Sequence, residues 1–371
     1  RGKNRRGNSM FWYLLNILII MIAGYTSVKG TDSYILDNQG SVLRKKRACV
    51  VATINCILMS GLRHISIGAD TLNYVYIFKN VLATSWEDIY NTIYQKYVFG
   101  FGDRDPAYLL LQKIFQIFSQ DYRVYFFFVA LLYFIPLGIA LYRHSTDVVM
   151  SYVLFISLYF GFFGTTGIRQ TIVSGIIFYF GVELILKRKL FLFLLLIILL
   201  STIHGSAICF IPFYWLSRIK INKFTLISYW VAIILSFVFK DKLLVILQHF
   251  AGYKDYTQYE GAGAPTFTLL MFLISLFISF YHEMIIGDDE FANLAVNAVF
   301  IGMFFSSLLM INPSFMRVVQ YYSVFLMYVL PQCQLAFKEG KSRRLYSIIV
   351  IIALVLLLIQ THPQYKFCWQ K

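Results

Sequence analysis

Long apolar runs separated by short polar segments dominate the pattern of this chain. A helix needs about 20 mostly apolar residues to cross the hydrocarbon layer of a membrane, and several runs approach or exceed that length. The runs lie at 10–28, 48–63, 123–142, 148–165, 168–186, 189–203, 205–217, 225–239, 266–286, 291–311, 316–336 and 345–361. We therefore predict an all-α, polytopic integral membrane protein with about 10–12 transmembrane helices.

The composition supports this prediction. Of the 371 residues, 59% are hydrophobic and 14% are charged, which is too little charge to cover the surface of a soluble protein. The five cysteines, at 49, 56, 209, 333 and 368, show no paired spacing, so we interpret them as core residues. No cluster of metal ligands and no phosphate-binding loop motif occurs in the sequence, and we expect neither a metal nor a cofactor.

The positive charges lie in short segments between the apolar runs. The net charge is +15, and Lys and Arg cluster at 44–47, 187–189, 218–223 and 338–344. Basic loops of membrane proteins remain on the cytoplasmic side, so these clusters orient the chain. The same placement argues against a nucleic-acid partner, which would require a basic surface rather than separate loops.

Two segments need separate treatment once the basic loops are placed inside. Residues 106–119 form a short amphipathic stretch that must lie in the interface or re-enter without crossing. Residues 189–217 are flanked by basic segments at both ends, so they must cross and turn back. The turn is expected at STIHGSA, residues 201–207.

This orientation places two long loops outside, at 64–122 and 240–265. Long loops beside a membrane core often form lids or binding elements. Residues 1–9 are basic and conflict with the orientation, so we treat them as a candidate non-native or upstream extension of a single membrane domain at 10–371. The polar residues left on the outer side are Arg63, His64, Asp70, Arg169, Gln170, His204 and Arg317. We expect an outward-facing site.

The segment at 63–74 combines charged residues with a helix start. Gly68 permits a sharp turn, Asp70 can cap the following helix, and Tyr74 lies one turn later on the same face. A structural interpretation makes Asp70 a helix cap and Arg63 a membrane-boundary residue. A functional interpretation makes Asp70 a base that removes a proton from a sugar hydroxyl.

Arg169 and Gln170 begin a helix after the turn FFGTTG. The N–H groups at a helix start favour anions, and an arginine there adds a fork of donors suited to phosphate. Gln170 offers an amide that can hold a hydroxyl. The alternative is that Arg169 marks the membrane boundary and meets lipid headgroups.

His204 lies at the predicted turn of a long apolar hairpin. Ionisable groups in such surroundings tend to serve function in membrane proteins, although a hydrogen-bonded structural histidine is the alternative. Asp105 and Tyr108 belong to the helix start DRDPAY, which offers a carboxylate near the cap and a phenol one turn on. A plain cap in a solvated loop is the alternative there.

Arg317, Gln320 and Tyr321 share one face of a late helix that follows an outer turn. Two helices thus begin with an arginine near the same membrane surface. Two converging arginines are what a diphosphate group requires, because each supplies charge-assisted donors.

These motifs, taken in order, resemble the EpsG family of bacterial membrane proteins, the Wzy-like polysaccharide polymerases. They are R-x(4)-G-x-D-T-x-x-Y at 63–74, RQ at 169–170, TIHGSA at 202–207 followed by PFYWL, and Arg317 with Tyr321. The resemblance covers roughly residues 48 to 360. Ala107 departs from it, since relatives tend to have glycine there.

The resemblance implies a polymerase that joins undecaprenyl-diphosphate-linked repeat units at the outer face of the bacterial cytoplasmic membrane. It implies a diphosphate held by Arg169, Arg317 and Arg63, and a base that is either His204 or Asp70. The residues left to orient sugars are Gln170, Tyr74, Gln320, Tyr321, Asp105 and Tyr108. A flippase and a chain-length regulator of the same pathway are implied as partners.

Two other classes of membrane protein compete with this interpretation. A flippase or other transporter commonly shows internal repeats and polar residues near the bilayer midplane. No clear repeat relates the two halves of the sequence, and its polar residues gather towards one face. A membrane O-acyltransferase would also use a histidine, but one that is reachable from the cytoplasm.

Overall fold

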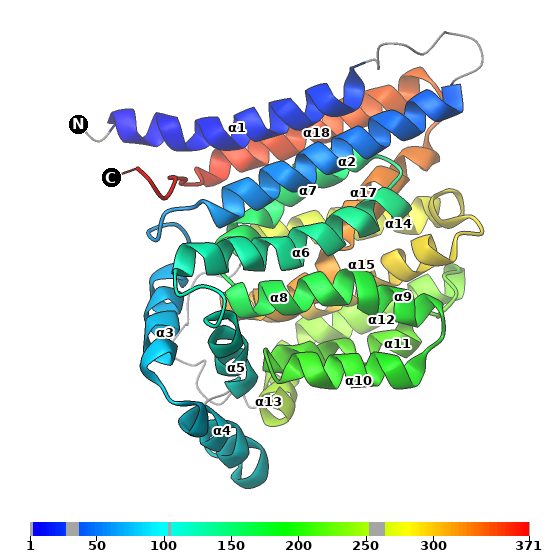
Figure 1. The fold of residues 1–371 in the computed structure, drawn as a ribbon. Helices are drawn as coiled ribbons and strands as arrows, with labels where there is room; N and C mark the ends of the chain where they lie inside the picture. Colours follow the sequence, from blue (N-terminus) through cyan, green and yellow to red (C-terminus); the bar gives the residue numbers. More distant parts are fainter. Residues whose placement is uncertain (1–2, 27–36, 103–104, 252–263, 371) are drawn as a thin grey trace. The chain divides into compact units, whose positions relative to one another are not determined.

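The computed structural model describes residues 3–26, 37–102, 105–251 and 264–370, drawn as coloured ribbon in Figure 1. Within these ranges the chain is helical almost throughout, and its β-structure is limited to an isolated bridge between Arg63 and Phe367. The predicted all-α class is confirmed. The backbone groups of an α-helix are satisfied internally, which is why an apolar chain inside a membrane takes this form.

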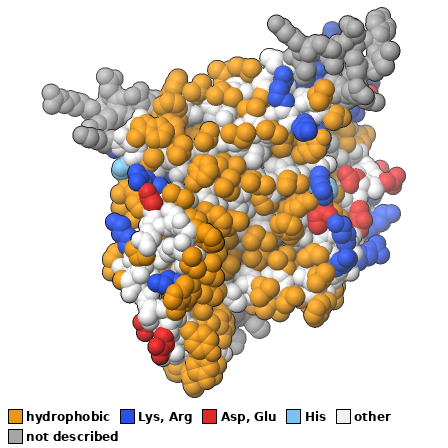
Figure 2. Space-filling view, in the orientation of Figure 1, with side chains coloured by type: hydrophobic (Ala, Val, Ile, Leu, Met, Phe, Trp, Pro, Cys, Tyr) orange, Lys and Arg blue, Asp and Glu red, His pale blue; other side chains and the backbone are white. Residues whose placement is uncertain are grey.

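The described part contains helices that are long and apolar enough to span a membrane. They are Tyr122–His144, Ile168–Leu186, Pro265–Ile286, Glu290–Leu309 and Lys341–Thr361, with shorter apolar helices at Met10–Tyr25, Val148–Leu158, Leu190–Ser201, Gly205–Leu216 and Lys223–Val238. These helices coincide with predicted spans. Large apolar side chains such as Phe191, Phe224 and Ile352 are exposed, and orange covers much of the visible surface in Figure 2. Exposed apolar area of this extent suits contact with lipid.

The chain forms two compact units. Unit 1 comprises Arg1–Glu183, Leu195–Gly205 and Ser347–Lys371, and unit 2 comprises Leu184–Leu194 and Ser206–Tyr346. The single membrane domain that we expected stays a prediction.

Unit 1 is built on a pair of long helices that pack against each other, α2 and α6. Its helices are α1 (Lys3–Tyr25), α2 (Asp37–Gly61), α3 (Thr71–Ala83), α4 (Trp86–Tyr94), α5 (Pro106–Phe115), α6 (Tyr122–His144), α7 (Val148–Leu158) and α8 (Ile168–Ile176). Helix α1 packs on α2 and α7, α8 on α6, and α3 and α4 on α5. Helices α9 (Val182–Leu186), α10 (Leu190–Ser201) and α18 (Lys341–Thr361) each belong partly to both units.

Unit 2 surrounds α15 (Glu290–Leu309), which is buried without interruption from Leu294 to Met303. Its remaining helices are α11 (Phe213–Leu216), α12 (Lys223–Val238), α13 (Lys240–Ala251), α14 (Pro265–Ile286), α16 (Met316–Ser323) and α17 (Leu326–Gln332). Helices α12, α14 and α16 all pack against α15. The Asn297 amide donates to the carbonyls of Ser217 and Ile219 at 3.2 and 2.9 Å, which fixes the basic loop that follows α11.

The two predicted outer loops contain helices. Within 64–122, the helix after Asp70 (α3) and the amphipathic stretch near 106–119 (α5) were expected, whereas α4 was not. The segment 240–265 begins with α13, and 252–263 lie outside the described residues. The predicted span at 316–336 is divided among α16, α17 and a 3₁₀ turn. An apolar-run criterion misses short amphipathic helices because polar residues interrupt their apolar ones, and it does not detect turns within a long apolar run.

A glycine allows the backbone before α3 to approach the turn that precedes α8. Gly68 has φ +91°, and a Cβ built on it would lie 2.2 Å from the carbonyl oxygen of Thr165. The hydroxyl groups of Ser60 and Thr71 donate to the carbonyls of Gly164 and Thr165 at 2.6 and 2.8 Å. These contacts hold the turn directly ahead of Arg169.

We expect Gly68→Ala to destabilise unit 1 by several kcal/mol, because it adds a steric clash to the cost of about 1 kcal/mol for a left-handed residue. Gly100→Ala is the matched control. Gly100 has φ +75°, but nothing lies within 4 Å of the place that its Cβ would occupy, so only the smaller cost applies. Thermal unfolding of the purified variants in detergent measures the difference, and equal losses of Tm would contradict this account.

Candidate functional site

The carboxylate of Asp105 is the centre of the candidate site. Asp105 precedes α5 at the N-cap position, with Pro106 at the first helical position, as the sequence predicted. Its side chain makes no capping hydrogen bond, however, and it is 8% exposed. The carboxylate is directed instead towards other segments of unit 1.

Three segments of the chain meet at this carboxylate. Oδ2 lies 2.6 Å from Nη1 of Arg169, which comes from the start of α8. Oδ1 accepts a hydrogen bond of 2.9 Å from the backbone N–H of Gly205, in the turn after α10. Nδ1 of His204, in the same turn, lies 3.6 Å from Oδ2. The structure therefore joins four residues from three segments that are as much as 100 positions apart.

The electrostatics of Asp105 follow from these contacts. Burial by itself raises the pKa of a carboxyl group, but His204, Arg169 and the Gly205 N–H together outweigh it, so the pKa of Asp105 lies below its ordinary value. The group is therefore ionised at neutral pH. A buried carboxylate is stable only when it is paired and hydrogen-bonded, and here both oxygens have partners.

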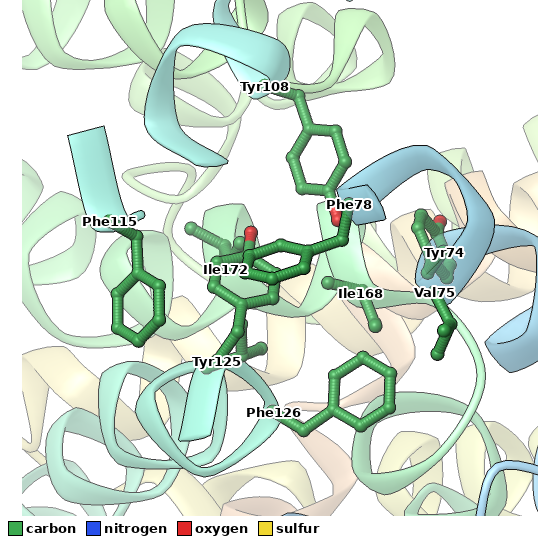
Figure 3. Close-up of a cluster of buried hydrophobic side chains, with 10 residues drawn as sticks. Tyr74, Val75, Phe78, Tyr108, Phe115, Tyr125, Phe126, Ile168 and Ile172 are labelled. Atoms are coloured by element: carbon green, nitrogen blue, oxygen red, sulfur yellow. The ribbon is translucent and has the colours of Figure 1, made fainter. Parts of the chain in front are cut away.

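Two tyrosines pack beneath Arg169. The guanidinium carbon lies 5.9 Å from the centre of the Tyr108 ring, within the range of a cation–π interaction. Tyr74 meets Tyr108 edge to face with ring centres 5.9 Å apart. Figure 3 shows both among the buried side chains of α3, α5, α6 and α8. Tyr108 is 2% exposed and Tyr74 6% exposed, so their rings support the arginine from the core side.

The other predicted residues of unit 1 have different surroundings. Asp70 occupies the N-cap position of α3 without a capping bond from its side chain. Arg63 is buried, with its guanidinium carbon 4.3 Å from the centre of the Phe126 ring and a hydrogen bond to the Ser60 carbonyl. Gln170 is 2% exposed within α8. Functional roles for these three residues stay predictions.

Arg317, Gln320 and Tyr321 lie on α16 in unit 2. Gln320 and Tyr321 are buried, and the Tyr321 hydroxyl lies 3.2 Å from Oγ of Ser206. The convergence of Arg317 with Arg169 stays a prediction.

Sequence reasoning missed three contributors to the Asp105 site. The Gly205 N–H is a backbone group, and the residue type gives no indication that it would act as a donor. Tyr97, on the π-helical turn Gln95–Phe99, interacts with the charge of Asp105 and hydrogen-bonds Thr202. Burial and the Asp105 charge raise the pKa of Tyr97, while Thr202 lowers it. Thr202 belongs to the TIHGSA motif, which was the available signal, whereas Tyr97 stands in an aromatic run without a pattern.

Unit 2 contains a separate pocket of about 560 Å³. Its lining includes Arg188, Arg218 and Lys220 from the basic segments and the acidic residues 288–290. Within the described ranges, no group of three or more His, Cys, Asp or Glu residues is arranged to hold a metal ion.

The fold and the site define a polytopic helical membrane protein in which a buried aspartate meets an arginine and a histidine. The model of the EpsG family matches residues 46–369, which include every residue of this cluster. The chain belongs to the EpsG family, a family of Wzy-like polysaccharide polymerases. No curated protein and no solved structure matches it.

The lowered pKa of Asp105 predicts a pH-dependent contribution to stability. Because the folded pKa lies below the unfolded value of about 3.9, the stabilisation is complete above that value and is lost as the pH falls through the folded pKa. We expect the wild type to exceed Asp105→Asn in Tm at about pH 6 to 7, with the gap closing towards about pH 3. Thermal unfolding in detergent across this range tests it, and a gap that is independent of pH would contradict it.

Proposed function

We propose that this protein polymerises undecaprenyl-diphosphate-linked oligosaccharide repeat units at the outer face of the bacterial cytoplasmic membrane, in capsule or exopolysaccharide synthesis. Membership of the EpsG family supports the polymerase class. The observation that carries the proposal furthest is the meeting of Arg169 and His204 at one carboxylate, since this supplies an anion-binding group and a base together.

Arg169 is proposed to hold the diphosphate of the donor. Its side chain is 33% exposed, and its Nη1 lies 2.6 Å from Oδ2 of Asp105. It stands in the first turn of α8, where the helix dipole also favours an anion. A guanidinium in this position stabilises the negative charge that develops on the leaving group.

His204 is proposed to be the base. The hydroxyl oxygen of the acceptor sugar attacks the anomeric carbon of the donor sugar, and His204 takes the hydroxyl proton. The bond between the anomeric carbon and the diphosphate oxygen breaks, and its electron pair leaves with undecaprenyl diphosphate. Asp70 is the alternative base.

The remaining assignments extend this proposal to the rest of the substrate. Arg317 and Arg63 are proposed as further diphosphate-binding residues, and a flippase and a chain-length regulator as partners. The proposed sugar-binding residues are Gln170, Tyr74, Gln320, Tyr321, Asp105 and Tyr108. The burial of Tyr74 and Tyr108 favours an indirect part, in which they hold Arg169 in place.

We expect Arg169→Ala and His204→Ala each to reduce chain elongation by about 10²-fold or more, because each removes a group that acts in the transition state. Membrane insertion should be unchanged. Arg123→Ala and His64→Ala are matched controls. Arg123 pairs with the neighbouring Asp121 at an exposed position, and Nδ1 of His64 lies 2.8 Å from Oγ of Ser66. Elongation at the wild-type rate by Arg169→Ala or His204→Ala would contradict the assignment.

A second experiment separates a polymerase from a flippase. The purified protein is incubated in detergent with lipid-linked repeat units, without a nucleotide sugar or an ion gradient. Longer glycans should form. Transbilayer movement of the lipid in proteoliposomes, with no new glycosidic bond, would favour the flippase instead.

A further inference from the structure

The geometry of the candidate site points to a part for Asp105 that differs from sugar binding. We propose that Asp105 is a positioning residue that releases Arg169 to the incoming diphosphate and then orients His204 alone. This inference rests on the proposed function, because it assigns the order in which the groups of that site act.

The first observation is that one oxygen serves two partners. Oδ2 of Asp105 lies 2.6 Å from Nη1 of Arg169 and 3.6 Å from Nδ1 of His204. The shorter distance is that of a charge-assisted hydrogen bond, whereas 3.6 Å exceeds the normal range. Oδ2 is therefore shared, with Arg169 at the shorter distance and His204 at the longer one.

The second observation is that the other oxygen is fixed. Oδ1 accepts the Gly205 N–H at 2.9 Å, and Gly205 directly follows His204 in the chain. The carboxylate therefore stays attached to the turn that carries the histidine, whatever Arg169 does. Pro106 begins α5 directly after Asp105 and restricts the backbone on the other side.

The third observation concerns Arg169. Nε of Arg169 is buried without a hydrogen-bond partner in the described structure, although the side chain as a whole is one-third exposed. An arginine whose Nε–H makes no hydrogen bond can reorient towards an acceptor of higher charge. A diphosphate carries more charge than one carboxylate and accepts two parallel hydrogen bonds from a guanidinium.

The chemical consequence lies in the tautomer of His204. Once Arg169 binds the diphosphate, Oδ2 is left to accept the Nδ1–H of His204. The imidazole is then held with its Nε2 lone pair available, and the adjacent negative charge favours the imidazolium that forms when it takes the proton of the acceptor hydroxyl. Binding of the lipid-diphosphate substrate thus activates His204 as the base.

Other titratable groups surround this arrangement. Tyr97 interacts with Asp105, and Tyr74 and Tyr108 interact with Arg169.

A binding measurement tests, without turnover, whether Arg169 exchanges Asp105 for the diphosphate. The full chain in nanodiscs is titrated with undecaprenyl diphosphate. We expect Asp105→Asn to bind about 10-fold more tightly than the wild type, because the competing charge is gone while an oxygen remains to accept the Gly205 N–H. Asp105→Glu, which keeps the charge, should bind like the wild type, and Arg169→Ala should lose binding.

Asp121→Asn is the matched control, since Asp121 also pairs with an arginine, but at an exposed position. Its affinity should not change. Equal or weaker binding by Asp105→Asn would overturn the exchange. If Asp105→Asn does not fold, Asp105→Ser is measured instead and is expected to bind undecaprenyl diphosphate more tightly than the wild type. Weaker binding by folded Asp105→Ser would overturn the inference.

Elongation of lipid-linked repeat units supplies the second readout. We expect Asp105→Asn to lower kcat by at least about 10²-fold without raising KM, and to move the acid limb of the kcat profile to lower pH by about one unit. A purely structural role would raise KM and leave the limb in place, which overturns the inference. Failure of the wild type itself to elongate would count against the proposed function rather than against the exchange of Asp105.

Discussion

The ionised carboxylate of Asp105 is the constraint on which the site of unit 1 depends. A charge with so little exposure has lost most of its hydration, and the protein must replace it with donors. Arg169 supplies a charged donor and Gly205 a backbone donor, from two segments distant in sequence. Because removing one partner of such a pair leaves an uncompensated charge, α5, the start of α8 and the turn after α10 are held together.

The partners are themselves held by contacts that do not involve the carboxylate. The turn ahead of Arg169 is fixed by hydroxyl groups from Ser60 and Thr71 and by the close approach of Gly68. From the core side, Tyr108 lies under the guanidinium and its hydroxyl accepts from Gln112 at 3.0 Å. A group meant to bind an anion is more effective when its position is set before the ligand arrives.

In unit 2, buried polar groups obtain their hydrogen-bond partners from neutral side chains. Asn297 is fully buried, and its amide serves the carbonyls at the end of α11 while its oxygen accepts from the Tyr229 hydroxyl at 2.6 Å. Amides satisfy backbone groups without the cost of burying a charge. Ionisable groups in membrane proteins carry a desolvation cost, which the neutral Asn297 avoids and the buried carboxylate of Asp105 does not.

The apolar runs predicted the long helices, because a run that crosses the membrane must satisfy its backbone hydrogen bonds internally, and a helix does so. They could not reveal α4 and α13, whose amphipathic sequences lack a long apolar run. Local pattern also marked Arg169 at a helix start, His204 at a turn and Asp105 at a cap. Only the tertiary structure decided that these three side chains meet, and that the carboxylate of Asp105 pairs with Arg169 instead of capping α5. The reason is that spacing along the chain specifies which residues share a helix face, whereas pairing across about 100 positions depends on how the helices pack.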